Sequence, residues 1–220
     1  VSGTAIVDTV NITVGGQALR ITLGTGNELQ EPTTTTYAVP YVAIVTDAAG
    51  NPAPNANFRL SVLSVAYQKG TKQFTNNGAD ADPNNDNQPD AFVPGYTVGP
   101  DPDSFGMGCM NEDTNGNGVL DTGEDINNST QLEPGNVATV PSTLPLDQNG
   151  SAEFTVTYPQ NFSQWVRVRL RAIASVQGTE TTSDATFILP VLASDVSNAA
   201  VAPPGQTSPF GTVGDCANPN

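Results

Sequence analysis

Apolar and polar residues alternate along much of the chain, and this pattern predicts β-strands. Between residues 166 and 174, Val166, Val168, Leu170 and Ala172 would share one face of a strand, and arginines occupy the other face. Similar alternation marks residues 4–14, 18–23, 37–46, 57–67, 151–158 and 182–192. No segment has the apolar period of an amphipathic helix. Strands of this length, punctuated by turns, predict an all-β protein built as an antiparallel β-sandwich.

Two stretches interrupt the strand pattern and define the predicted organisation. Residues 68–146 are rich in Asp, Asn, Gly and Pro and predict a long, loop-rich insertion. Residues 193–220 carry no strand signal and predict a C-terminal tail. Residues 1–17 contain a Gly-Gly pair at positions 15 and 16 and are interpreted as an N-terminal strand or linker. The predicted domain therefore covers residues 18–192 and carries the insertion within it.

Residues 113–124 carry the clearest candidate chemistry. They read DTNGNGVLDTGE and match the calcium-loop pattern D-x-[DN]-x-[DN]-G-x5-E at every constrained position. Calcium prefers a shell of oxygen ligands, which such a loop supplies from alternate positions. The backbone carbonyl of Val119 is one expected donor. The others are side-chain oxygens, from Asp113, Asn115, Asn117, Asp121 and Glu124. The alternative is an Asn/Gly-rich surface turn that binds no ion.

The sequence on either side of this loop does not predict helices. Residues 102–109 and 126–134 contain Pro or Gly and show no helical apolar period. In an EF-hand, by contrast, a helix flanks the calcium loop on each side. We therefore expect a structural calcium clamp within a long connection, not half of a calcium-sensing helix pair.

A second, weaker calcium loop is predicted at residues 82–90. It resembles the loops of thrombospondin type 3 repeats, down to a Pro-Asp pair, and would use these residues: Asp82, Asn84, Asp86, Gln88 and Asp90. It departs from the pattern at Val93, where a bidentate carboxylate is expected. The alternative is a turn favoured by Asp, Asn and Pro.

The distribution of charge supports bound cations in the insertion. The chain has 22 Asp and Glu against 7 Lys and Arg, a net charge of −15, and no Lys or Arg lies between Gln73 and Val166. Carboxylates crowded into a compact loop repel one another and resist ordering. Bound calcium would offset this repulsion, so we expect calcium binding and local folding of residues 75–135 to be coupled.

The two cysteines, Cys109 and Cys216, are predicted to form a disulfide. Weak calcium loops function where calcium is plentiful, outside the cell, and cysteines in that compartment are usually paired. The bond would connect the C-terminal tail to the insertion. The alternatives are two separate thiols or a bond to another chain.

Three segments resemble a known family. Residues 41–62, with the turn DAAGNPAPNA, resemble the central hairpin of bacterial immunoglobulin-like domains of the invasin/intimin type. Residues 146–157, LDQNGSAEFTVT, resemble a later strand start in those domains, and residues 166–174 resemble the strand that follows. The resemblance implies an immunoglobulin-like sandwich, arranged in tandem on a cell-surface adhesin. Typical members lack an insertion like residues 68–146.

Composition and motifs argue against several functions. The acidic charge disfavours nucleic-acid binding, and no apolar run is long enough for membrane insertion. The chain has no His, which removes His-based triads and His-ligated zinc. No nucleophile-elbow, phosphate-loop or dinucleotide motif is present. We therefore predict that the protein is not an enzyme.

A basic stripe is the remaining candidate binding surface. Arg167, Arg169 and Arg171 would project from one strand face and contact a partner's carboxylates or an acidic glycan. Trp165, close to Tyr158, could add a platform for a sugar. The alternatives are an arginine face neutralised by the chain's own acidic insertion, and aromatic rings that pack at the rim of the sandwich.

The sequence thus predicts an extracellular structural or adhesive module of a bacterial surface protein or fibre, rigidified by Ca²⁺. Its expected partners are neighbouring immunoglobulin-like domains, copies of itself, or a host or glycan ligand. One alternative is a pilus-like subunit whose strand at residues 4–14 inserts into a neighbour. Another alternative is a carbohydrate-binding accessory module.

Overall fold

A computed structural model describes residues 18–26, 28–75, 91–97 and 108–220 of the chain. Nearly all of its regular structure is β-strand. The described helical elements are a single 3₁₀ turn, η1 (Gln160–Phe162), and one short helix, α1 (Ala193–Val196). The prediction of an all-β protein is confirmed.

The first sheet is organised around its longest strand, β3 (Thr36–Asp47). β1 (Leu19–Thr25) and β2 (Gln30–Thr33) pair along one edge of β3, and β9 (Ser151–Pro159) pairs along the other. All of these pairings are antiparallel. Tyr41 on β3 lies opposite Phe154 on β9, and their rings stack with centroids 5.7 Å apart.

The second sheet is also antiparallel, with β10 (Val166–Val176) between β11 (Thr179–Ile188) and β4 (Asn57–Tyr67). Two short strands, β7 (Cys109–Met110) and β8 (Thr143–Leu144), pair with the opposite ends of β4. The strand predicted at residues 182–192 corresponds to β11, which begins and ends earlier than predicted. β11 follows a two-residue turn in which Gln177 and Gly178 both have positive φ, and it stops before Pro190, which lacks an N–H for the ladder.

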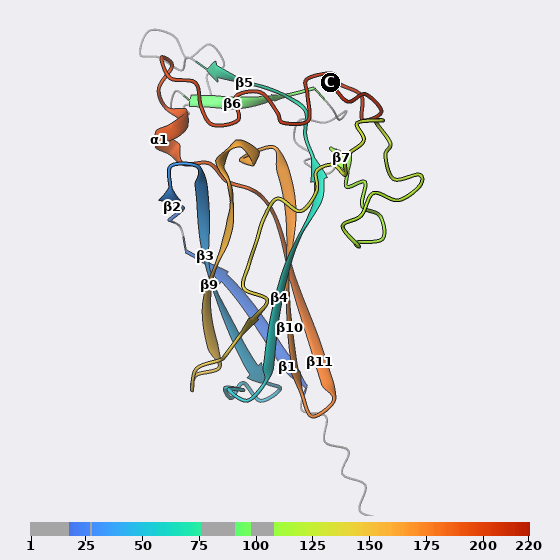
Figure 1. Ribbon diagram of the computed structural model, residues 1–220. Helices are drawn as coiled ribbons and strands as arrows, with labels where there is room; N and C mark the ends of the chain where they lie inside the picture. The colour runs from blue at the N-terminus through green and yellow to red at the C-terminus, as the bar shows by residue number, and fades with distance from the viewer. Residues whose placement is uncertain (1–17, 27, 76–90, 98–107) are drawn as a thin grey trace, which may run out of the picture.

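The two sheets face each other across one shared core (Figure 1). The alternation predicted for β10 is confirmed, because Val166, Val168, Leu170 and Ala172 are fully buried. Buried Tyr37 and Val39 of β3 belong to the same cluster. Contiguous burial of apolar side chains from both sheets is the main force that holds a sandwich together. The architecture is thus a sandwich-like pair of antiparallel sheets.

A hairpin outside the two sheets crosses one end of the molecule (Figure 1). It consists of β5 (Gly70–Thr75) and β6 (Ala91–Tyr96), which pair antiparallel. The C-terminal tail lies along this hairpin: Ser208 donates a backbone hydrogen bond to Gly70, and Lys72 donates one to Gln206. The tail is therefore a packed part of the fold.

Candidate metal centre

The predicted calcium loop at residues 113–124 lies in the irregular segment between β7 and β8, and no helix flanks it. Its turns use positive φ at three glycines, with φ of 73° at Gly116, 72° at Gly118 and 94° at Gly123. A Cβ atom would be strained there, which explains why the pattern requires glycine at the position of Gly118.

The first half of the loop folds around the side chain of Asp113. Its Oδ1 accepts a hydrogen bond from the backbone N–H of Asn117 at 3.1 Å, and its Oδ2 accepts one from Gly118 at 2.9 Å. Oδ1 of Asn115 also accepts from Asn117, and Oδ1 of Asn117 accepts from Val119. These bonds turn the side-chain oxygens of alternate residues toward the inside of the loop.

The second half of the loop closes back on the first through two carboxylates. Asp121 Oδ2 accepts from the side-chain amides of Asn115 and Asn117, each at 2.8 Å, and these bonds lower the pKa of Asp121. Glu124 is buried, and its oxygens accept from the N–H of Asp121 at 3.0 Å and from the N–H and hydroxyl of Thr114. The backbone bond from Asp121 is the largest cause of a lowered pKa at Glu124.

Hydrogen bonds in the loop therefore join the side chains of Asn115, Asn117 and Asp121, while the carboxylates of Asp113 and Glu124 accept from backbone N–H groups of the same loop. Carboxylate and amide oxygens are the donors that a hard cation such as Ca²⁺ prefers, so the donor set fits that ion. Within the described part of the chain, no three Cys, Asp or Glu side chains gather as a metal cluster. A cation held here would therefore depend on the amide oxygens of Asn115 and Asn117 as well as on carboxylates.

The same arrangement recurs at residues 125–133, which the sequence interpretation missed. Asp125 Oδ1 accepts from the N–H of Ser129 at 2.9 Å, and its Oδ2 accepts from Thr130 at 3.0 Å. Oδ1 of Asn127 also accepts from Ser129, and the Asn127 amide donates to Glu133 at 2.7 Å. Each bond has its counterpart twelve residues earlier in the first loop.

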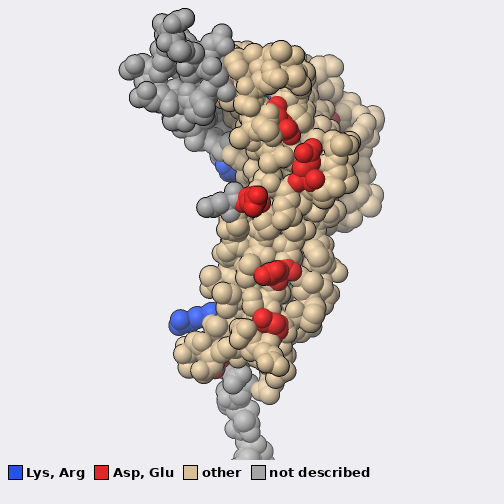
Figure 2. All heavy atoms as spheres, turned by 90° about the vertical axis from the view of Figure 1, so that its left-hand side faces the viewer, with Lys and Arg blue, Asp and Glu red and all other residues tan. Residues whose placement is uncertain are grey.

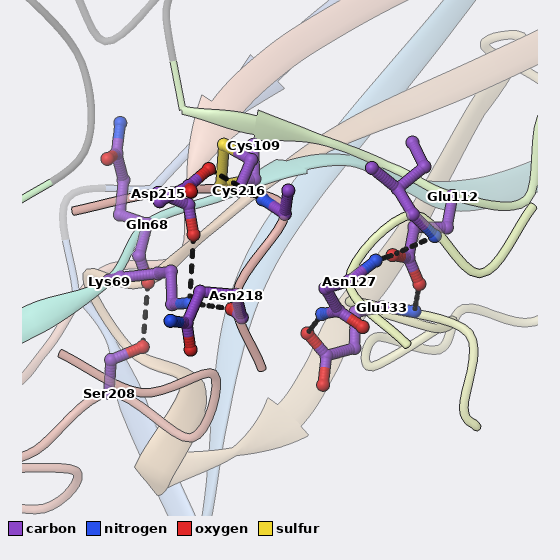
Figure 3. Close-up of a disulfide and its surroundings, with 12 residues drawn as sticks. Gln68, Lys69, Cys109, Glu112, Asn127, Glu133, Ser208, Asp215, Cys216 and Asn218 are labelled. Atoms are coloured by element: carbon purple, nitrogen blue, oxygen red, sulfur yellow. Dashed lines mark hydrogen bonds between the residues drawn. A yellow bond between two sulfur atoms is a disulfide. The ribbon is translucent and has the colours of Figure 1, made fainter. Parts of the chain in front are cut away.

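Glu112 takes the place in the second loop that Glu124 holds in the first. It is 1% exposed and accepts backbone hydrogen bonds from Ile126, Asn127 and Glu133 at 3.0–3.3 Å. Glu124 likewise accepts from the second and ninth positions of its own loop. Burial raises the pKa of Glu133, whose side chain lies on the same side of this loop as Glu112 (Figure 3).

A sequence signal for the repeat exists but is incomplete. Aspartate, asparagine, leucine, an acidic residue and glycine recur at a spacing of twelve between residues 113–123 and 125–135. The second copy has Ser129 and Thr130 in place of Asn117 and Gly118, and its closing carboxylate comes from before the loop. Only the fold shows that Glu112 replaces the missing twelfth residue. The predicted loop at residues 82–90 lies outside the described residues.

The predicted disulfide is confirmed between Cys109 and Cys216, whose Cα atoms are 5.4 Å apart. It joins the tail to β7, a few residues before the first loop (Figure 3). Beside it, the buried ammonium of Lys69 donates to the backbone oxygens of Asn218 and Asp215. Burial is the main cause of a lowered pKa at Lys69.

The predicted basic face is arranged differently from either expectation. Arg171 forms a bidentate ion pair with Asp184 of the adjacent β11, at 2.7 and 2.8 Å, and this pair lowers the pKa of Asp184. Arg59 on β4 pairs with Glu180 of β11 at 2.9 Å. The neutralising carboxylates of these two pairs thus come from β11 and not from the acidic insertion.

The suggestion that Trp165 offers a sugar platform is wrong. Its ring is fully buried against Tyr96, and its Nε1 donates to the Gly205 carbonyl at 2.6 Å. Tyr158 is also buried and donates to Pro190. A tail that folds over the end of the sandwich covers this tryptophan, and the sequence around Trp165 carries no sign of that contact.

Comparison with known proteins leaves the family open. No protein-family model matches the chain, and searches of curated proteins and of solved structures found no match. Among the described residues, no helix has the length and apolar character needed to cross a bilayer.

Proposed function

We propose that this protein is a calcium-stabilised structural module of an extracellular bacterial surface protein or fibre. The observation that carries the proposal is the loop at residues 113–124. It matches the calcium pattern at each constrained position, and the carboxylates of Asp113, Asp121 and Glu124 accept hydrogen bonds from other residues of the same loop. Calcium bound there would add positive charge to a segment that contains no Lys or Arg.

The architecture is compatible with an immunoglobulin-like domain. Two antiparallel sheets share one core, and the turns that resemble the invasin/intimin type are built around aspartates. Asp47 Oδ1 accepts from the N–H groups of Ala49 and Asn51, and Asp147 Oδ1 accepts from Asn149 and Ser151. The disulfide supports an oxidising compartment outside the cell.

The two alternative functions have less support. The strand-exchange filament depends on residues 4–14, which lie outside the described residues. The carbohydrate-binding module depended on Trp165, which is buried. A structural role agrees with the finding that the candidate metal centre and the tail are both held by many local hydrogen bonds.

Calcium titration of the full chain by calorimetry tests the proposal, with limited proteolysis of residues 108–136 as a second readout. We expect heat of binding and protection from protease in calcium, and loss of both in chelator. Glu124→Gln should weaken calcium binding by about tenfold or more, because the loop loses its bidentate carboxylate ligand. Glu153→Gln, an exposed carboxylate on β9, is the matched control.

Two results would contradict the proposal. One is the absence of binding heat at millimolar calcium. The other is equal cleavage of residues 108–136 in calcium and in chelator. Retained binding in Glu124→Gln together with lost binding in Glu153→Gln would move the site away from this loop.

A further inference from the structure

The exposed positive charge of this acidic chain is concentrated on one sheet face. Lys69 and Lys72 are buried, so arginines supply the cations at the surface. Four of the five arginines project from the outer face of the second sheet, on β4 and β10: Arg59, Arg167, Arg169 and Arg171. They face outward because each alternates with buried residues of the core.

Within the described residues, two of the chain's own carboxylates form ion pairs on this basic face. Glu180 and Asp184 pair with Arg59 and Arg171. Within the described ranges Arg169 forms no salt bridge, and its Nε is buried without a hydrogen-bond partner. Leu63, the register partner of Arg169 on β4, is 39% exposed. The centre of the basic face is therefore an arginine beside an exposed apolar side chain.

The first sheet is mainly acidic on its exposed side, with Arg20 on β1 as its described cation. Glu28, Glu31 and Glu153 are exposed on or beside β2 and β9. Figure 2, seen from the side of β2, β3 and β9, shows carboxylates spread along the length of the molecule. This acidic face also contains a groove of about 490 Å³ lined by Pro40, Val42, Pro141 and Glu153, among others. The groove thus combines an apolar surface with a carboxylate.

We propose that two copies of this chain associate by placing the basic face of one on the acidic face of the next. Leu63 and Arg169 of one copy would contact the apolar lining and Glu153 of the groove. The contact joins two different surfaces, so each added copy leaves one of each face free and the assembly grows as an open chain. Opposite charges on the two faces determine which surfaces meet. The net charge of −15 makes whole copies repel one another, so the association is weak.

Sedimentation velocity over a range of protein concentrations tests this contact. At about 0.15 M salt we expect the wild type to shift from monomer to larger species as concentration rises, and about 1 M salt should abolish the shift. Arg169→Glu and Glu153→Arg should each weaken association tenfold or more. Mixing these two variants should restore it, because the reversed charges are again complementary. Gln73→Glu on the β5–β6 hairpin controls for an added negative charge.

Three results would overturn the proposal. The first is that the wild type stays monomeric at every concentration. This result overturns the proposal even if the protein binds an added anionic polysaccharide, the rival ligand for the basic face. The second is unchanged association in Arg169→Glu. The third is failure of the mixed variants to associate. If Arg169→Glu does not fold, as thermal melting will show, Leu63→Asp at the exposed neighbouring position carries the same test.

Discussion

Strand β10 and the segment 111–136 bury side chains of opposite character. β10 buries a row of aliphatic residues, and its polar side chains face outward. In segment 111–136 the buried residues are Glu112, Glu124 and Asn127, together with Pro134. The first region is stabilised by removal of apolar surface from water, and the second by carboxylates that accept backbone N–H bonds.

This contrast shows how one domain can contain two regions whose stability responds differently to pH and to local unfolding. Apolar burial in the sandwich is insensitive to pH and is lost only on global unfolding. Charge-assisted hydrogen bonds in segment 111–136 depend on the protonation of a few carboxyls, and the segment can open locally. The disulfide lies outside both regions and ties the tail, through Cys216, to β7, which immediately precedes segment 111–136.

Breaking that connection should have the largest effect on stability. The Cys109–Cys216 bond closes a loop with a sequence separation of 107. Replacing both cysteines with alanine should lower the free energy of unfolding by about 4 kcal/mol, mainly because the unfolded chain gains freedom. Urea denaturation measures the change, with reduced wild-type protein as the comparison. A loss below about 1 kcal/mol would show that hydrogen bonds alone hold the tail.

A cavity in the sandwich should destabilise the whole domain. Leu170 is fully buried in the centre of β10, so Leu170→Ala should cost about 3 kcal/mol in global stability. Thr182→Ala, at an exposed position on β11, is the control and should change stability by less than about 0.5 kcal/mol. Hydrogen exchange should speed up in every strand. Acceleration confined to β10 would contradict cooperative unfolding of the two sheets.

Removing one carboxylate from segment 111–136 should open that segment while the sandwich stays folded. Glu112→Gln replaces one acceptor oxygen with a donor that faces backbone N–H groups, at a local cost of about 1–3 kcal/mol. Hydrogen exchange at residues 112–133 measures the opening. Glu180→Gln, an exposed ion-pair carboxylate on β11, should leave exchange in that segment unchanged. Unaltered exchange in Glu112→Gln would mean that the segment does not depend on this side chain.

The smallest effect concerns the dependence of stability on pH at Lys72. Burial lowers the pKa of Lys72 from 10.5 to about 8, and among the described residues the partners of its ammonium are neutral: Pro204 O, Ser163 Oγ and the ring of Trp165. Between these pH values the unfolded chain holds more protons than the folded one, so stability should rise with pH. Between about pH 7 and pH 9.5 the rise should be about 2 kcal/mol.

Lys72→Met should abolish that rise, because methionine does not titrate. Arg20→Met, which removes an exposed cation from β1, should preserve it. Denaturation curves at the two pH values measure both variants. An equal rise in Lys72→Met and in the wild type would assign the pH dependence to another group.

Several elements could be predicted because their signals are local. The alternation at residues 57–67 predicted β4 with its observed bounds. The last strand was predicted to run through Pro190 to residue 192, but β11 ends at Ile188. The β5–β6 hairpin was missed, because its two strands are separated by a long, Asp- and Asn-rich stretch. No local pattern shows which distant strand will pair with a six-residue segment.

The sequence by itself determined most strands of the two sheets, the motif at residues 113–124 and the charges available for pairing, since each depends on residues close together in the chain. Tertiary structure alone decided that Glu112 serves the second loop, that the tail buries Trp165, and that the arginines meet Glu180 and Asp184. These contacts join residues up to 121 positions apart. They arise only when burial of the core has set the register of the strands, and periodicity carries no information about that register.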